Sequence, residues 1–294
     1  MSNTRFSQFL SGTLLYSLGG TLNMLALLAP TTAGAIALKL FSMPRPSKAR
    51  KHQEAFIAGA KKLEIGINGV AVRYYIWEGK GPAVLLAHGW ESNASRWAPL
   101  ISALQREGFA VYALDAPAHG ASGGSIFTVK LYAEVLQELM PILRPDVLVG
   151  HSAGGMAAVF MLHQAPEMPL QRLVLLSVPA ELEQLMDTFR RMSYMGERVF
   201  GGMQRAFVRR YGWQMKDFSL SRFIAGVEVP GLLLHDREDP VAPYAGAIEL
   251  HRHWRGSTFI PFEGLGHSLP GEQVIQTIVN HLGQVLDSRV NLQS

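Results

Sequence analysis

Three residues of this sequence have the types and the spacing that nucleophilic catalysis requires. Ser152 stands in Gly-His-Ser-Ala-Gly, directly after the strand-forming run DVLVG. His267 stands in EGLGHSLP, and Asp239 in HDREDPVAP. A serine hydroxyl attacks a carbonyl carbon when a base takes its proton, and a carboxylate must hold that base in one tautomer. The pattern predicts a nucleophile, an acid and a base in the chain order serine, aspartate, histidine.

The surroundings of Ser152 favour a nucleophile over an ordinary glycine-serine turn. A buried strand is predicted before it and a helix over residues 152–164 after it. The flanking glycines permit a tight strand-to-helix turn. The positive end of the helix would favour negative charge that develops near the hydroxyl.

The base and the acid have competitors. Of the ten histidines, His267 alone lies in a glycine-flanked loop after the last predicted strand. For the acid, Asp236 and Glu238 are close alternatives to Asp239, and Glu181 is a more distant one after an earlier strand.

The predicted elements would bring these residues together. Asn68-Gly69 is a strong two-residue hairpin signal between two alternating runs. Beyond it, short runs of Val and Leu alternate with segments of helical spacing, which indicates a mostly parallel sheet of about eight strands with helices on both faces. Ligands of such α/β sheets bind beyond the carboxyl ends of the strands. Each candidate residue follows such an end.

Composition limits the function classes. The chain has 294 residues, 48% of them hydrophobic, and no cysteine, which excludes disulfides, thiol catalysis and cysteine-bound zinc. The formal net charge is +4, but residues 1–52 contain six bases and no acid, so residues 53–294 are slightly acidic. No nucleic-acid-binding motif accompanies the basic segment, and we expect no nucleic-acid partner.

Residues 1–52 form a hydrophobic and basic N-terminal arm that lacks any charged residue between Phe6 and Leu38. Three interpretations remain open: a membrane anchor within residues 6–41, a signal peptide cleaved near Ala33-Gly34-Ala35, or helices that pack on the body or lie in the membrane interface. If the arm spans a membrane, the bases between Arg45 and Lys51 predict a catalytic body on the cytoplasmic side; the alternative is a cytoplasmic protein. We expect residues 53–294 to fold without the arm.

Residues from about 62 to 287 resemble the α/β-hydrolase superfamily, close to its esterase/lipase-like serine hydrolases. The resemblance rests on five motifs: His88-Gly-Trp90, Asp115-Ala-Pro-Ala-His119-Gly, Gly-His-Ser152-Ala-Gly, His-Asp-Arg-Glu-Asp239 and Gly-His267. It implies the α/β-hydrolase fold, with a helical cap inserted at about residues 180–226. The arm lies outside the common domain of that superfamily.

The resemblance also implies roles. The backbone N–H groups of Trp90 and Ala153 should form an oxyanion hole, and His88 and His119 should be structural loop residues. It implies a hydrolase of carboxylic esters, with apolar acyl groups preferred, that needs neither a metal nor an organic cofactor. Thioesterase, peptidase, carbon–carbon bond hydrolase and acyltransferase activities use the same triad and remain open. So does a non-catalytic binding module on this fold.

Overall fold

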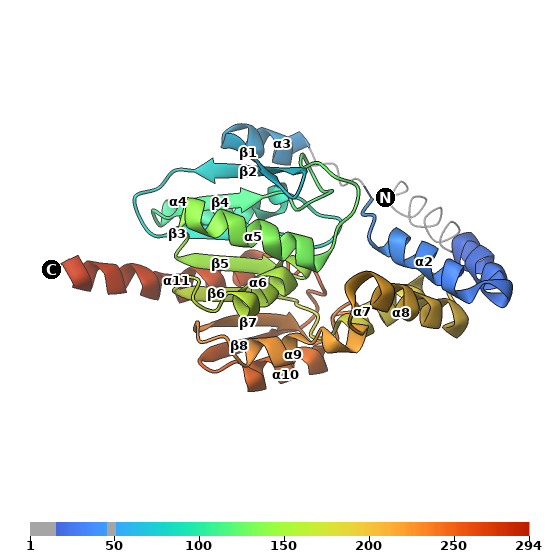
Figure 1. Cartoon of the computed structure of the whole chain (residues 1–294). Coiled ribbons are helices and arrows are strands. Elements are labelled where there is room, and N and C mark those ends of the chain that lie inside the picture. Colours follow the sequence, from blue (N-terminus) through green and yellow to red (C-terminus); the bar gives the residue numbers. More distant parts are fainter. Residues whose placement is uncertain (1–15, 46–50, 294) are drawn as a thin grey trace. The chain divides into compact units, whose positions relative to one another are not determined.

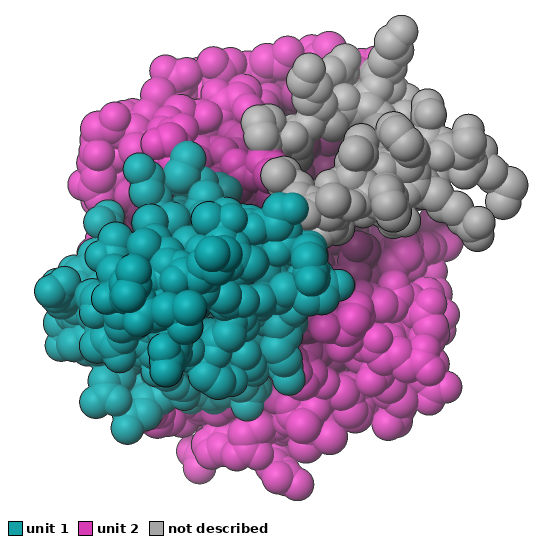
Figure 2. Space-filling model, turned by 90° about the vertical axis from the view of Figure 1, so that its right-hand side faces the viewer, with its two compact units in different colours: residues 1–43, 181–219 teal, residues 44–180, 220–294 magenta. Residues whose placement is uncertain are grey.

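The chain divides into two compact units. The computed structural model describes residues 16–45 and 51–293. Unit 1 comprises Met1–Met43 and Glu181–Ser219, and unit 2 comprises Pro44–Ala180 and Leu220–Ser294 (Figure 2). The N-terminal segment is thus grouped with most of the segment that we expected to be a cap inserted in the hydrolase domain.

Unit 2 is built on one sheet of eight strands in the order β1-β2-β4-β3-β5-β6-β7-β8 (Figure 1). Only the pairs β1–β2 and β2–β4 are antiparallel, so the prediction of a mostly parallel sheet is confirmed. The strands are β1 (Lys61–Ile67), β2 (Val70–Trp77), β3 (Ala83–Ala87), β4 (Ala110–Leu114), β5 (Val147–His151), β6 (Arg172–Leu176), β7 (Gly231–Asp236) and β8 (Ser257–Phe262).

The turn between β1 and β2 has the predicted hairpin geometry. Asn68 and Gly69 both have positive φ angles, of 49° and 76°. Positive φ angles at both central residues define a type I′ turn, whose twist matches that of the paired strands. Asparagine followed by glycine adopts this turn at little cost in free energy. The register then pairs Ile67 with Val70.

Helices cover both faces of the sheet (Figure 1). A core of side chains from alternate strand positions packs against α4 and α11 on one face, where α3 adds Phe56 and Ile57. On the other face α6 packs against α5 and α9, and α9 against α10. The helices of this unit are α3 (Lys51–Ala58), η1 (Ala94–Trp97), α4 (Ala98–Arg106), α5 (Val129–Leu143), α6 (Ala153–Gln164), α9 (Leu220–Ile224), α10 (Tyr244–His253) and α11 (Glu272–Gln293).

The topology places the candidate catalytic residues at one edge of the sheet. Ser152 immediately follows β5, Asp239 lies three residues beyond β7, and His267 lies five residues beyond β8. Since these strands are parallel, their carboxyl ends share one edge. Ser152 and His267, which are 115 positions apart in the sequence, can therefore meet.

Unit 1 is helical. It contains a helix over residues 16–28, α2 (Pro30–Phe41), α7 (Leu182–Met192), α8 (Glu197–Tyr211) and the short η2 (Met215–Asp217). α2 and α8 cross at two glycines, because a Cβ on Gly34 would lie 1.9 Å from the carbonyl carbon of Gly202. Asn23 joins the first helix to the turn between α7 and α8 by donating to the carbonyl oxygen of Tyr194 (2.9 Å) and accepting from the N–H of Gly196 (2.6 Å).

Across residues 16–45 and 51–293, no helix has both the length and the apolar character needed to cross a membrane. Residues 6–15 of the uncharged N-terminal segment lie outside the described residues, as do 46–50 of the basic cluster.

The glycine crossing yields a stability prediction. In Gly202→Ala the new Cβ would lie 2.0 Å from the carbonyl oxygen of Pro30, so α2 and α8 must separate. Overpacking of this kind costs about 1–3 kcal/mol of unfolding free energy. Urea unfolding together with amide hydrogen exchange in α2 and α8 would measure the loss.

The adjacent glycine is the matched control. A Cβ on Gly201 would meet only the end of the Arg205 side chain, at 3.5 Å. Gly201→Ala should therefore stabilise α8 by up to about 1 kcal/mol, through the better helix propensity of alanine. Equal stability of the two variants would show that the crossing is not tightly packed.

Candidate active site

Ser152 occupies a strained turn between β5 and α6. Its φ and ψ angles are 51° and −121°, a conformation that costs free energy for any residue with a side chain. Its N–H donates to the carbonyl oxygen of Leu176 on the neighbouring strand (2.9 Å), and its carbonyl accepts the N–H of Met156 in α6 (3.0 Å). The backbone on both sides of the serine is therefore fixed.

Two glycines allow other backbone segments to approach this turn. A Cβ on Gly154 would lie 2.3 Å from the carbonyl oxygen of Ala87, at the end of β3. A Cβ on Gly89, in the loop after β3, would lie 2.9 Å from the Cβ of Ser152. Side chains at these positions would push the turn and the loop apart.

His267 and Asp239 complete a hydrogen-bonded chain with Ser152. Nε2 of His267 lies 2.9 Å from Oγ of Ser152, and Nδ1 lies 2.8 Å from Oδ2 and 3.1 Å from Oδ1 of Asp239. The carboxylate accepts a hydrogen bond from the N–H at Nδ1, which leaves the lone pair of Nε2 directed at the serine hydroxyl. The side chain of Asp239 is buried, whereas that of His267 is 20% exposed.

The environment of Asp239 favours its ionised form. Burial alone would raise the pKa of this carboxyl, but the hydrogen bond to His267 and the N–H groups of Ala242 and Val241 hold the pKa below its usual value. Those two N–H groups donate to Oδ1 at 2.9 and 2.8 Å. The carboxylate is thus charged and fixed beside the imidazole at neutral pH.

The competing acids lie elsewhere. Asp236 accepts the N–H groups of Glu238 and Leu265, both at 2.8 Å, and so organises the turns that carry the catalytic residues. Glu238 is exposed. Glu181 belongs to unit 1 and accepts a hydrogen bond from the hydroxyl of Ser219 (2.8 Å). Only Asp239 meets His267.

Two buried histidines hold the loop that carries Trp90. Nδ1 of His88 donates to the carbonyl oxygen of Gly89 (2.7 Å), and its Nε2 accepts the N–H of Ala116 (2.9 Å). Burial lowers the pKa of His88 to about 3, so the ring is neutral and can donate and accept at once. His119 likewise accepts the N–H of Glu91 (3.0 Å), next to Trp90.

The two residues that we predict to form the oxyanion hole, Ala153 and Trp90, belong to segments beside the nucleophile. Ala153 is the first residue of α6, and the N–H groups of a first helical turn have no partner within the helix. Trp90 follows Gly89, on which a Cβ would lie 2.9 Å from the Cβ of Ser152, and the ring of Trp90 packs edge-on against His119 at a centroid distance of 5.7 Å. The assignment of these two N–H groups to an oxyanion hole stays a prediction.

Comparison with known proteins places the chain among relatives of the same fold. The model of the alpha/beta hydrolase family matches residues 84–278, which is more than half of the chain. The chain belongs to the alpha/beta hydrolase family. The match begins within β3, extends beyond β8 and includes every candidate catalytic residue.

Two curated relatives and one solved structure show the range of similar proteins. The "AB hydrolase superfamily protein YisY" of Bacillus subtilis is 22% identical over 64% of this chain and 86% of its own length. A pimeloyl-[acyl-carrier protein] methyl ester esterase of Nitrosomonas europaea is 23% identical over 65% and 90%. The crystal structure of a membrane phospholipase A superposes with a TM-score of 0.63 and 19% identity, covering 96% of this chain and 99% of the other.

In this alpha/beta hydrolase, a third buried histidine supports the base, a role that sequence analysis missed. Nε2 of His151 lies 2.8 Å from the carbonyl oxygen of His267, and its Nδ1 faces the guanidinium of Arg96. A guanidinium can only donate, so Nδ1 accepts and Nε2 carries the proton. Burial, and then the charge of Arg96, lower the pKa of His151 well below its usual value.

Arg96 also holds Ser268, the residue that follows His267 in its loop. Its second terminal nitrogen donates to the carbonyl oxygen of Ser268 (3.1 Å), and its guanidinium lies 4.9 Å from the ring centroid of Trp97. Burial lowers the pKa of Arg96 to about 10, so the side chain stays charged at neutral pH. Nothing in the sequence around Arg96 indicates this contact, because it joins residues 172 positions apart.

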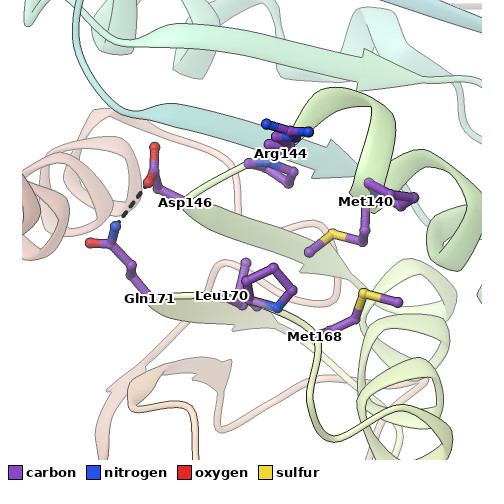
Figure 3. A pocket seen from close by; sticks show the side chains of 9 residues that line it. Met140, Arg144, Asp146, Met168, Leu170 and Gln171 are labelled. Carbon is purple, nitrogen blue, oxygen red and sulfur yellow. Dashed lines mark hydrogen bonds between the residues drawn. The ribbon is translucent and has the colours of Figure 1, made fainter.

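The structure contains a hollow at the opposite edge of the sheet. Its volume is about 730 Å³, and it lies between the end of α5 and the segment before β6 (Figure 3). Asp146 at its rim has a structural role, since its carboxylate accepts hydrogen bonds from the side chain of Gln171 (2.8 Å) and from the N–H of Ala83 (2.7 Å). Among the described residues no group of three or more His, Cys, Asp and Glu side chains could hold a metal ion.

The support of the base can be tested at Arg96. In Arg96→Met the carbonyl of Ser268 loses its donor, and His151 loses the cation that fixes its tautomer. Leaving Nδ1 of the buried His151 unsatisfied costs about 1–3 kcal/mol of unfolding free energy, whereas water can replace the donor to the exposed Ser268. We also expect hydrolytic turnover to fall by roughly tenfold or more with little change in KM, because a displaced base affects the chemical step.

Arg106→Met is the control for this change, since Arg106 is an exposed base in the last turn of α4. It should alter neither turnover nor stability appreciably. Wild-type turnover in Arg96→Met would show that the loop holds His267 without this support.

Proposed function

We propose that the protein is a serine hydrolase of carboxylic esters that works through an acyl-enzyme on Ser152. The observation that carries the proposal is the pair of hydrogen bonds that joins the hydroxyl of Ser152 to His267 (2.9 Å) and His267 to the buried carboxylate of Asp239 (2.8 Å). These three residues come from three different loops at one edge of the sheet. A purely structural role would not require a strained serine at its end.

The first step of the reaction follows from this arrangement. His267 takes the hydroxyl proton on Nε2 while Oγ of Ser152 bonds to the ester carbonyl carbon. Asp239 stabilises the imidazolium that results. Collapse of the tetrahedral adduct breaks the bond to the alcohol oxygen, which receives the proton from His267. In the second step His267 takes a proton from water while the water oxygen bonds to the acyl carbon; the bond from that carbon to Oγ of Ser152 then breaks, Oγ recovers the proton from His267, and the acid leaves.

Charge that develops on the carbonyl oxygen needs donors beside Ser152. We propose that the N–H groups of Trp90 and Ala153 supply them. The proposal is supported by the closeness of the Gly89 loop to Ser152 and by the position of Ala153 at the start of α6. Removing one donor of this kind costs about 2.7–4 kcal/mol of transition-state stabilisation in a related mechanism. The helix end adds to the favourable potential.

We further propose that the acyl group is apolar. Support comes from the relatives, which include a methyl ester esterase and a phospholipase by name. Thioesterase, peptidase, carbon–carbon bond hydrolase and acyltransferase reactions use the same three side chains. Rates on aryl esters of increasing acyl length, beside a thioester and an amide of matched length, rank esterase, thioesterase and peptidase activities. A non-catalytic binding module would hydrolyse none of them.

The nucleophile can be tested with a fluorophosphonate probe, which labels only an activated serine. Ser152→Ala should lose both labelling and hydrolysis while its unfolding transition stays close to that of the wild type. Ser177→Ala is the matched control, because Ser177 is also a buried serine with positive φ at a strand end. It should remain labelled. Labelling that persists in Ser152→Ala would move the nucleophile to another residue.

The acid can be tested by an isosteric pair of changes. Asp239→Asn should reduce turnover by roughly 10⁴-fold, because the amide no longer selects the productive tautomer of His267. Glu181→Gln should leave turnover near the wild-type value, since Glu181 contacts Ser219 instead. Steady-state kinetics on a short aryl ester measure both. The reverse ranking would assign the acid to the segment after β6.

A further inference from the structure

Large exposed apolar side chains are concentrated in unit 1. Ten such side chains are exposed among the described residues, and nine of them belong to this unit: Tyr16, Met24, Leu27, Leu28, Ile36, Met43, Met192, Tyr194 and Val208. The tenth is Ile142 at the end of α5 in unit 2. Scattered apolar residues are normal on a protein surface, but a gathering of this kind indicates an interaction site.

The helix over residues 16–28 carries the centre of this surface. Its buried face is formed by Gly19, Leu22 and Ala26, and Asn23 beside them bonds to the turn between α7 and α8. The opposite face contains Met24, Leu27 and Leu28, which are 74%, 63% and 93% exposed. The protein side of the helix is therefore fixed, while its apolar side faces outward.

No charged side chain breaks the exposed face of this helix. The residues that the face exposes are Tyr16, Ser17, Gly20, Thr21, Met24, Leu27 and Leu28. A surface helix of a water-soluble domain usually carries charged and polar residues opposite its buried stripe. Here that side is apolar or uncharged along the whole described length.

The turn between α7 and α8 extends the same surface. The rings of Tyr16 and Tyr194 meet edge-on at a centroid distance of 5.1 Å. Tyr194 and nearby Met192 are 58% and 60% exposed. Tyrosine, with an apolar ring and a polar hydroxyl, is enriched where a protein meets the boundary between hydrocarbon and water.

Unpaired cations lie next to this surface. Arg198, Arg205 and Arg209 are exposed, share one face of α8 at helical spacing, and form no ion pair among the described residues. Nε of Arg205 donates to the hydroxyl of Thr31 (3.3 Å), three residues beyond Leu28. By contrast, Arg190 forms ion pairs with Asp187 and Glu197, and Arg191 forms one with Asp187.

The charge of unit 1 has the sign that anionic headgroups attract. Its described segments contain eight bases and five acids: Lys39, Arg190, Arg191, Arg198, Arg205, Arg209, Arg210 and Lys216 against Glu181, Glu183, Asp187, Glu197 and Asp217. Apolar side chains flanked by arginines match the interfacial zone of a bilayer that carries negative charge.

We propose that unit 1 docks on the surface of an anionic lipid bilayer, with the helix over residues 16–28 lying in the interface and the arginines of α8 on the headgroups. The described helices do not span the membrane. They bind it from one side through Met24, Leu27, Leu28 and the residues of the α7–α8 turn. This proposal does not depend on the hydrolase assignment.

Flotation of the full-length protein with vesicles tests the docking. Vesicles of phosphatidylcholine containing phosphatidylglycerol should carry the protein upward, and vesicles of phosphatidylcholine alone should carry less of it. The variant Met24→Glu/Leu28→Glu should bind the anionic vesicles at least roughly tenfold more weakly, because two carboxylates would enter the apolar zone. Ile142→Glu, a matched change in unit 2, should bind as the wild type does.

The arginines are tested separately. Arg205→Gln should weaken binding to anionic vesicles by roughly fivefold, the effect of removing one cation near a charged surface, and should leave binding to neutral vesicles unchanged. High salt should reduce the binding of the wild type in the same direction. Hydrolysis of a short water-soluble ester, measured on every variant, shows that unit 2 is folded and separates a failure of docking from a failure of the catalytic proposal.

Two results would overturn the proposal. One is wild-type protein that does not float with anionic vesicles, or that floats no better than Met24→Glu/Leu28→Glu. The other is wild-type protein that is a dimer without lipid while Met24→Glu/Leu28→Glu is a monomer, measured by sedimentation equilibrium, because the surface would then be covered by a second copy of the chain.

Discussion

The site depends on a close approach of backbone segments at Ser152. A Cβ on Gly150 would lie 2.6 Å from Cα of Gly155, and one on Gly154 would lie 2.3 Å from the carbonyl oxygen of Ala87. The end of β5, the start of α6 and the end of β3 therefore meet at distances that no side chain would allow. This packing holds Ser152 in a conformation that an isolated chain would avoid. The strain is offset by the buried sheet and α6 on either side.

Neutral histidines brace the loops around that turn. The rings of His88, His119 and His151 are buried, and burial lowers the pKa of each. A neutral imidazole offers one donor and one acceptor on opposite sides of a rigid ring, so it can join an N–H group of one loop to a carbonyl oxygen of another. Protonation would replace the acceptor with a second donor and break the connection. His267 differs from them, because its side chain is partly open to solvent and its Nδ1 faces a carboxylate.

Much of this site could be predicted because local pattern determines it. Ser152, Asp239 and His267 each follow a strand that is recognisable from its run of Val, Leu or Phe, and parallel strands bring such ends to one edge. The contacts of Arg96 could not be predicted, since they depend on how η1 packs beneath a loop far along the chain. Sequence analysis favoured Asp239 and left Asp236 as an alternative, because both lie in one turn; the geometry of that turn directs Asp239 towards the histidine and Asp236 towards the N–H of Leu265.

The N-terminal segment packs with residues that lie far along the sequence, so position in the sequence does not show which folded unit a segment belongs to. We expected residues 53–294 to fold without it. Yet Gly34 of α2 lies against Gly202 of α8, and the rings of Phe41 and Phe189 meet at a centroid distance of 5.1 Å. An insertion of about forty residues is too short to bury an apolar core alone. Without α2, the apolar face of α8 that α2 covers would be open to water. The two segments of unit 1 therefore complete each other's core, while the exposed apolar face of the helix over residues 16–28 lies opposite the side that this packing uses.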